Sequence, residues 1–270
     1  APAFEIGEVD LQLDFSSVQP FMDILEIPIQ ASGKTWVHIQ PATLVSLSEE
    51  KLKSLTLDAK IQNEQVRIYS GIHRLESLNG NILFHYENDA LQASSQDLNL
   101  TFKNPQISLK SALLKLKAKT LLSDWTSGTP SGNTQLDIQS QISTISAAQA
   151  SITELNAHLL LNGPSAIFGG LQAQLPLEYD LNIQTGPIQK DNVQVARLDA
   201  TTNGQLYDLS AHSLFNKLEL TAQKIQLSNP KQTVEFQKAV GDISVRKKGQ
   251  SLHFEPSNLQ IDDLVHIGVE

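Results

Sequence analysis

The sequence predicts an all-β fold, built as an elongated and mostly antiparallel sheet with few short helices. Apolar and polar residues alternate with period two over much of the chain, as in residues 9–15 and 175–183. Successive side chains of a strand point to opposite faces, so such segments form a sheet with one apolar and one polar face. Turn dipeptides such as Asn79-Gly80 and Asn203-Gly204 are expected to separate the alternating segments.

The predicted strands follow one another along the whole chain. In order they are residues 9–15, 55–61, 65–69, 81–86, 98–102, 107–109, 113–118, 135–142, 157–161, 175–183, 194–201, 217–222, 224–227, 233–236, 243–245, 251–254, 258–261 and 265–269. Segments 98–106 and 224–232 each join a strand to an Asn-Pro step. This similarity fits a sheet made of similar hairpins laid side by side.

Helical signals are few. Ser48 is a candidate cap for a short helix at residues 48–52, and a helical turn is possible at 208–215. Residues 141–159 carry apolar residues at helical spacing, including Ile142, Ile145, Ile152 and Leu155. The same region is rich in β-branched residues, which favour strands, so both interpretations stay open there.

Composition limits the partners and the chemistry. The chain has 270 residues, a formal net charge of −9 and no cysteine. The acidic balance argues against a nucleic-acid partner, and disulfides and cysteine-ligated zinc are excluded. In residues 110–119, Lys115, Lys117 and Lys119 alternate with apolar residues. This run is either a solvated strand face with edge-protecting lysines or a surface that meets anionic lipid headgroups.

Motifs for catalysis are absent from the sequence. The seven histidines include no pair at HxH or HxxxH spacing, and there is no nucleophile elbow or phosphate-binding glycine loop. We therefore expect a protein that is not an enzyme, with no metal site and no cofactor. Its function is then expected to depend on what the apolar face of the sheet covers.

Three architectures would hide an apolar sheet face. The sheet can close into a barrel, it can pack on a second sheet as a sandwich, or it can curl into an open groove that a guest molecule fills. A fatty-acyl chain suits such a groove, because each buried methylene contributes roughly 0.8 kcal/mol. The alternation fits the sandwich and the groove equally.

Segments 91–100, 152–163 and 198–204 are polar-alternating strands with abundant Gln and Asn-Gly-type turns. In this texture, from about Leu75 onward, the chain resembles the AsmA-like family of bacterial envelope proteins, YdbH type. Residues 1–50 match this texture less closely. The resemblance implies a curled, taco-shaped sheet with an open hydrophobic groove. It also implies a long periplasmic protein, anchored by a helix in the inner membrane of a Gram-negative bacterium, that conducts phospholipid toward the outer membrane.

These expectations give residues 1–270 as one elongated groove segment, a fragment of a longer membrane-anchored protein. Its function would be non-enzymatic lipid transport between the two membranes. The alternative is a structural or adhesive β-sandwich module of a larger envelope protein. The open strand at 265–269 would suit strand addition by an envelope partner. The expected groove lining is Leu98, Leu100, Phe102, Leu177, Tyr179, Leu181, Ile183, Leu218 and Leu220.

Overall fold

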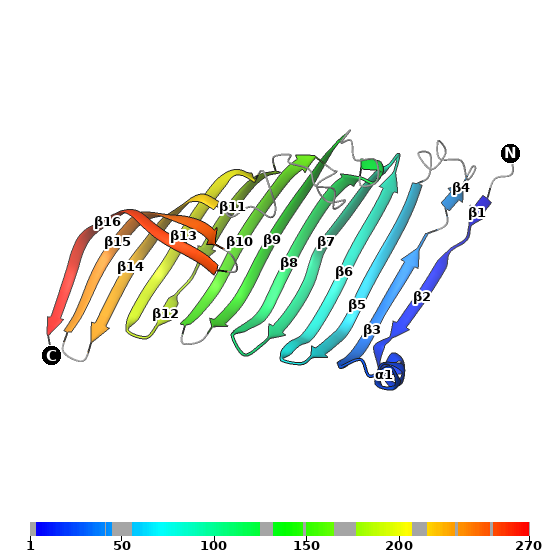
Figure 1. The fold of residues 1–270 in the computed structure, drawn as a ribbon, viewed down its shortest axis with the longest axis horizontal. Helices are drawn as coiled ribbons and strands as arrows, with labels where there is room; N and C mark the ends of the chain where they lie inside the picture. The colour runs from blue at the N-terminus through cyan, green and yellow to red at the C-terminus, as the bar shows by residue number, and fades with distance from the viewer. Residues whose placement is uncertain are drawn as a thin grey trace.

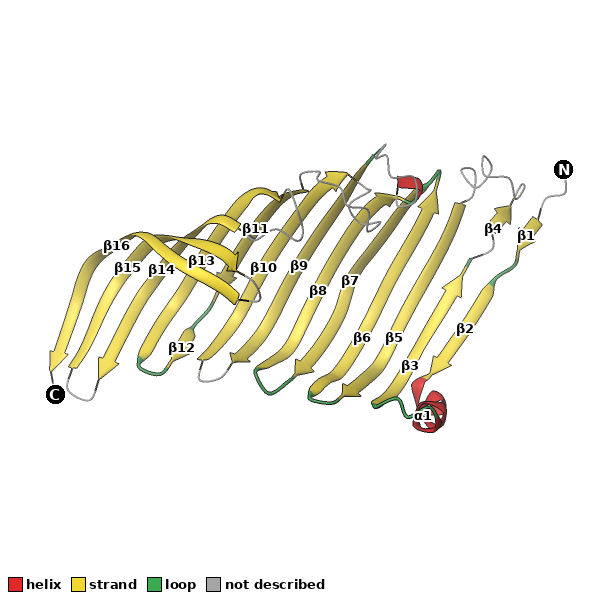
Figure 2. Cartoon of the chain, in the orientation of Figure 1, coloured by secondary structure: helices red, strands yellow, loops and turns green. Residues whose placement is uncertain are grey.

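The computed structural model describes residues 4–40, 42–44, 56–124, 132–147, 150–164, 177–206, 215–229, 232–248 and 251–269. Within these residues the predicted all-β class is confirmed. A 14-stranded antiparallel sheet extends through the molecule, together with a two-stranded sheet and one short helix (Figures 1 and 2). In Figure 1 the sheet is elongated and curled, and its strands β14, β15 and β16 bend over sharply at the left of the view.

The large sheet is a meander in which each strand pairs with its neighbours in chain order. Its strands are β2 (Val9–Asp14), β3 (Ile29–Ile39), β5 (Thr56–Ser70), β6 (His73–Glu87), β7 (Ala90–Lys103), β8 (Ile107–Leu121), β9 (Asn133–Ala147), β10 (Ala150–Pro164), β11 (Leu177–Thr185), β12 (Ile188–Lys190), β13 (Val193–Leu206), β14 (Phe215–Asn229), β15 (Gln232–Lys248) and β16 (Ser251–Val269). β11 and β12 both pair with β10 and β13. β1 (Phe4–Ile6) pairs with β4 (Ala42–Leu44).

This topology decides whether the strands form a sandwich. A sandwich divides its strands between two sheets that pack face to face. Here the strands from β2 to β16 follow one continuous hydrogen-bonded path. β2 and β3, from the part of the chain that matched the resemblance less closely, belong to the same sheet. These strands therefore form one curled sheet and not a sandwich.

The described helix, α1 (Phe15–Ile24), was not predicted. The sequence predicts a strand over residues 9–15, whereas β2 ends at Asp14. Oδ1 of Asp14 accepts a 3.0 Å hydrogen bond from the backbone N–H of Ser16. This carboxylate caps the helix. The side chain of Gln19 then ties α1 to β3, donating to the carbonyl of Ile29 and accepting from the N–H of Ala31.

Residues 141–147 and 150–159 form parts of β9 and β10, so the strand interpretation is correct there. The predicted helix at 48–52 lies outside the described residues. So does the possible turn at 208–215, apart from Phe215, which begins β14. The Asn-Gly turns predicted at 79–80 and 203–204 are wrong, because these residues lie inside β6 and β13.

In many strands the apolar alternation shifts by one residue, and the shifts of neighbouring strands lie side by side across the sheet. Apolar-face residues that should be two positions apart are three apart in the following pairs: Leu75 and Leu78, Leu109 and Ala112, Ile142 and Ile145, Ile152 and Leu155, Val195 and Leu198, Ala222 and Ile225, and Phe236 and Ala239. From β8 to β10 and from β13 to β15 the register places these pairs directly opposite one another. We call this line the crease.

Backbone geometry marks the crease. Gln65, Ser111, Glu154 and Lys224 have left-handed backbone there, with φ between 46° and 56°. Such irregularities bend a strand and increase its local twist, so the crease is a line along which the sheet can bend. It also explains why segments 55–61 and 65–69, predicted as separate strands, are halves of β5.

Glycines on neighbouring strands make room for the crease. Gly80 has a φ of +117°, and a Cβ atom added to it would lie 2.3 Å from the backbone oxygen of Asp97 in the shifted part of β7. Gly33 has the same relation to the backbone oxygen of Gln65. Only glycine tolerates both this φ and this close approach.

Replacing Gly80 by alanine should therefore destabilise the fold. We expect Gly80→Ala to lower the free energy of unfolding by about 1–3 kcal/mol, measured by urea denaturation. Gly7→Ala is the matched control, because no atom lies within 4 Å of the added Cβ. It should change stability by less than about 0.5 kcal/mol. Equal stabilities of the two variants would contradict this role of Gly80.

Candidate functional site

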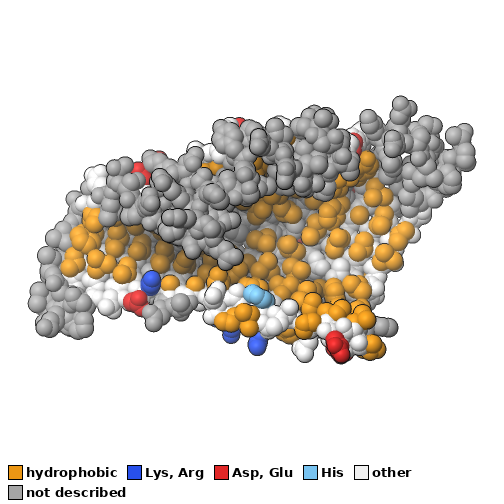
Figure 3. Space-filling model, viewed as in Figure 1, with side chains coloured by type: hydrophobic (Ala, Val, Ile, Leu, Met, Phe, Trp, Pro, Cys, Tyr) orange, Lys and Arg blue, Asp and Glu red, His pale blue; other side chains and the backbone are white. Residues whose placement is uncertain are grey.

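The two faces of the sheet differ in burial. Every strand side chain that is buried in the described residues lies on the apolar face: Val66, Ser95, Ala112, Thr120, Thr134, Leu177, Tyr179, Thr185, Ala200 and Thr202. Figure 3 shows hydrophobic side chains covering a large part of the face turned toward the viewer. The sheet therefore curls toward its apolar face.

Most of the apolar face is not packed against other protein. Among the described side chains, the buried hydrophobic residues are Val66, Ala112, Leu177, Tyr179 and Ala200. The chain exposes 17061 Å² in all. A compact protein of 29.6 kDa would expose about 11,600 Å². A single-layer sheet accounts for this large difference, because nothing in the described residues forms a second layer over it.

The expected lining residues whose side chains are described occupy apolar-face positions in the register. Leu98, Leu100 and Phe102 are half-buried in β7. Leu98 faces Leu114 of β8, and Leu100 faces Ala112. These residues are placed as a groove lining requires, since their side chains are neither packed away nor fully exposed.

The β11 residues divide into two kinds. Leu181 and Ile183 are half-buried, whereas Leu177 is 3% exposed and Tyr179 is 5% exposed. Leu177 and Tyr179 therefore pack as ordinary core residues.

In β14, Leu220 is half-buried and faces Ala200 of β13. The backbone of Leu218 pairs with Ile243 of β15, and its side chain lies outside the described part of the structure.

The most continuous apolar feature was missed by sequence reasoning. On one side of the crease, a single large hydrophobic residue of each strand lies in register with the next. The members of this apolar row are Ile68, Leu75, Phe102, Leu109, Ile145, Ile152, Ile188, Val195, Ile225 and Phe236. Each of them is half-buried. The row therefore crosses the sheet from β5 to β15 without a polar side chain between its members.

The opposite face carries cross-strand pairs of histidine and aspartate. His38 Nδ1 lies 2.7 Å from Asp10 Oδ1, and His85 Nδ1 lies 2.7 Å from Asp58 Oδ1. The hydrogen bond with Asp58 is the main cause that raises the pKa of His85 above its ordinary value. These pairs lie on the polar face without an adjacent nucleophile in the described residues, so they form no catalytic arrangement.

Glu8, Asp10 and His38 bring their ligand atoms within 4.8 Å of one another near β2, an edge strand. Sequence spacing could not have indicated this cluster, because His38 comes from the adjacent strand. Exposed carboxylates often gather in this way without a metal, and the cluster by itself does not make a metal site.

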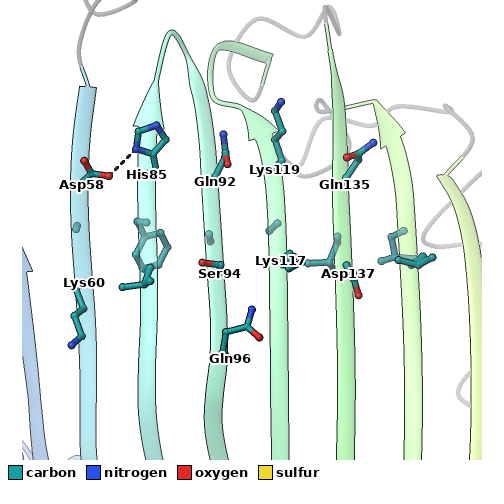
Figure 4. Close-up of a pocket in the computed structure, with 18 of the residues that line it drawn as sticks. Asp58, Lys60, His85, Gln92, Ser94, Gln96, Lys117, Lys119, Gln135 and Asp137 are labelled. Carbon is teal, nitrogen blue, oxygen red and sulfur yellow. Dashed lines mark hydrogen bonds and ion pairs between the residues drawn. The ribbon is translucent and has the colours of Figure 1, made fainter.

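A hollow of about 1070 Å³ lies on the polar face, lined by residues of β3 and of β5 to β10. We call it the polar hollow. Figure 4 shows its lining side chains, which include Lys60, Lys117, Lys119, Gln92 and Gln135. The lysines of β8 belong to the basic run in the sequence, and the structure joins them to a lysine that is far away along the chain.

No family model, curated protein or solved structure matches this chain. Over the residues that the structure describes, no helix is both long enough and apolar enough to cross a membrane. The geometry of the sheet is therefore the basis for inferring a function.

The His85–Asp58 pair gives a pH-dependent prediction. In Asp58→Asn we expect the pKa of His85 to fall, as followed by NMR titration of the ring protons, because the charged acceptor is lost. Because the pKa of His85 is higher in the folded state than in the unfolded state, the protonated ring stabilises the fold. This contribution is complete at pH values below the unfolded-state pKa of 6.5, and it is lost as the pH rises through the folded-state pKa. The variant should therefore lose more stability at acidic than at alkaline pH.

Asp180→Asn serves as the control, because Asp180 lies on β11, away from His85. It should leave the titration curve of His85 unchanged. An unaltered His85 curve in Asp58→Asn would refute the assigned cause.

Proposed function

We propose that this chain is a non-enzymatic module that shields phospholipid acyl chains along its apolar face. The observation that carries the proposal is the apolar row, whose members are in register and half-buried from β5 to β15. Half-buried aliphatic side chains over so many strands leave apolar surface in water, which is unfavourable by about 25 cal/mol per Å². A guest with long hydrocarbon chains would remove this cost.

The direction of the row suits movement of the guest. Neighbouring strands lie about 4.8 Å apart, so the row extends roughly 40 Å across the sheet. The hydrophobic effect has no directional requirement, so an acyl chain can shift from one strand to the next with little change in free energy. The module needs no catalytic group for this task, because the lipid is carried and not altered.

The resemblance to the AsmA-like family supports the setting that we propose, which is the periplasm of a Gram-negative bacterium, between the inner and outer membranes. The parent protein would be anchored in the inner membrane. β16 is an edge strand of the sheet, and residues 265–269 lie in it. An edge strand offers unpaired backbone groups, so we propose that an envelope partner adds a strand there.

Lipid retention tests this function. The purified chain should carry phospholipid, detected by native mass spectrometry. Leu181→Asp should reduce the bound lipid severalfold, because it places a carboxylate on the apolar face between Leu159 and Thr202. Leu83→Asp should retain lipid, because Leu83 lies on the polar face and is 51% exposed.

Circular dichroism of both variants separates the outcomes. A folded Leu181→Asp protein without lipid supports the proposal. Unfolding of Leu181→Asp would make Leu181 a core residue and remove support for the groove. A wild-type chain free of phospholipid would overturn the carrier function and favour a structural or adhesive role.

A further inference from the structure

The polar hollow lies on the face opposite the apolar row. Its side chains come from two neighbouring positions along each strand, for example Asp58 and Lys60 of β5 and Lys117 and Lys119 of β8 (Figure 4). A lipid on the apolar face would not fill it. The proposed carrier function therefore does not account for the polar hollow.

Cations in the polar hollow are unpaired. In a chain with a net charge of −9, Lys60, Lys117 and Lys119 line one hollow, and none has a carboxylate partner among the described residues. Lys117 faces Asp137 in the register, but the Asp137 carboxylate lies 2.9 Å from Nε2 of His158.

The other acid of the hollow, Asp58, is paired in the same way with His85. Histidines thus hold both carboxylates, and the ammonium groups remain available for a ligand that carries negative charge.

Amide side chains provide a second requirement. Asn162, Gln92 and Gln135 line the hollow, and each amide can both donate and accept hydrogen bonds. Gln92 and Gln135 flank Lys119 in the register. A ligand with hydroxyl groups as well as an anion matches this combination of amides and lysines.

Two leucines provide a third requirement. Leu83 and Leu160 line the hollow and are 51% and 40% exposed. The C–H faces of a sugar ring can cover such side chains, while its hydroxyl groups meet amides. A phosphate or carboxylate group on the sugar would meet the lysines.

We propose that the polar hollow binds an oligosaccharide that carries carboxylate or phosphate groups. Its volume, about 1070 Å³, suits a ligand larger than a monosaccharide. Binding here is independent of lipid on the apolar face, so the two proposals can fail separately.

Calorimetric titration of the purified full chain tests this proposal. The probe is an oligomer of galacturonic acid, with an uncharged maltose-series oligomer of the same length as the reference. We expect the acidic oligomer to bind and the uncharged one to bind at least about tenfold more weakly, because charge-assisted hydrogen bonds to the lysines are missing. Added salt should weaken binding of the acidic oligomer.

Paired variants assign the binding to the hollow. The double variant Lys117→Gln and Lys119→Gln should lower affinity for the acidic oligomer at least about tenfold. Lys110→Gln is the matched control, because Lys110 is an exposed lysine of the same strand outside the hollow. It should change affinity less than about twofold. Leu181→Asp should leave oligosaccharide binding intact even when it abolishes lipid retention.

Several results would overturn the proposal. These are no binding of the acidic oligomer by the wild-type chain, equal binding of the uncharged oligomer, and an equal loss in Lys110→Gln. Binding to phosphatidylglycerol vesicles that depends on Lys117 and Lys119 would also overturn it, because the surface would then be a membrane-docking site.

Discussion

The constraint on which the rest of the structure depends is that each strand must keep its apolar residues on the same face as its neighbours. A slip of one residue would turn every side chain of a strand to the opposite face. At the crease the strands shift phase together, so that Leu109 faces Ile145 and Ile145 faces Ile152. The apolar face therefore continues across the sheet, and left-handed residues such as Glu154 absorb the extra length.

A single layer then determines how the molecule can act. The strands follow one path, and within the described residues no second sheet covers them. The apolar face therefore has few buried side chains there, and the chain exposes a large area. The two faces differ in chemistry. One offers a continuous hydrocarbon surface, and the other offers lysines, amides and paired carboxylates.

The alternation of residues predicted the fold class, and the lining of a groove stays a prediction. It could not predict the crease, because a spacing of three occurs in helices as well as at a phase shift. Ile142 and Ile145 were therefore ambiguous, and the two halves of β5 were predicted as two strands. Only Phe102 of the apolar row was expected, because the row depends on register between strands. The polar hollow depends in the same way on residues of seven strands, β3 and β5 to β10.

The most direct test of the account is photo-crosslinking from adjacent residues on opposite faces. A photoreactive phenylalanine at Val195, in the apolar row, or at Gln194, on the polar face, is placed in the purified chain and illuminated with vesicles of radiolabelled phospholipid. The account predicts labelled lipid attached at Val195 and little at Gln194. Equal labelling at both positions, or none at Val195, would contradict the claim that the uncovered face holds acyl chains.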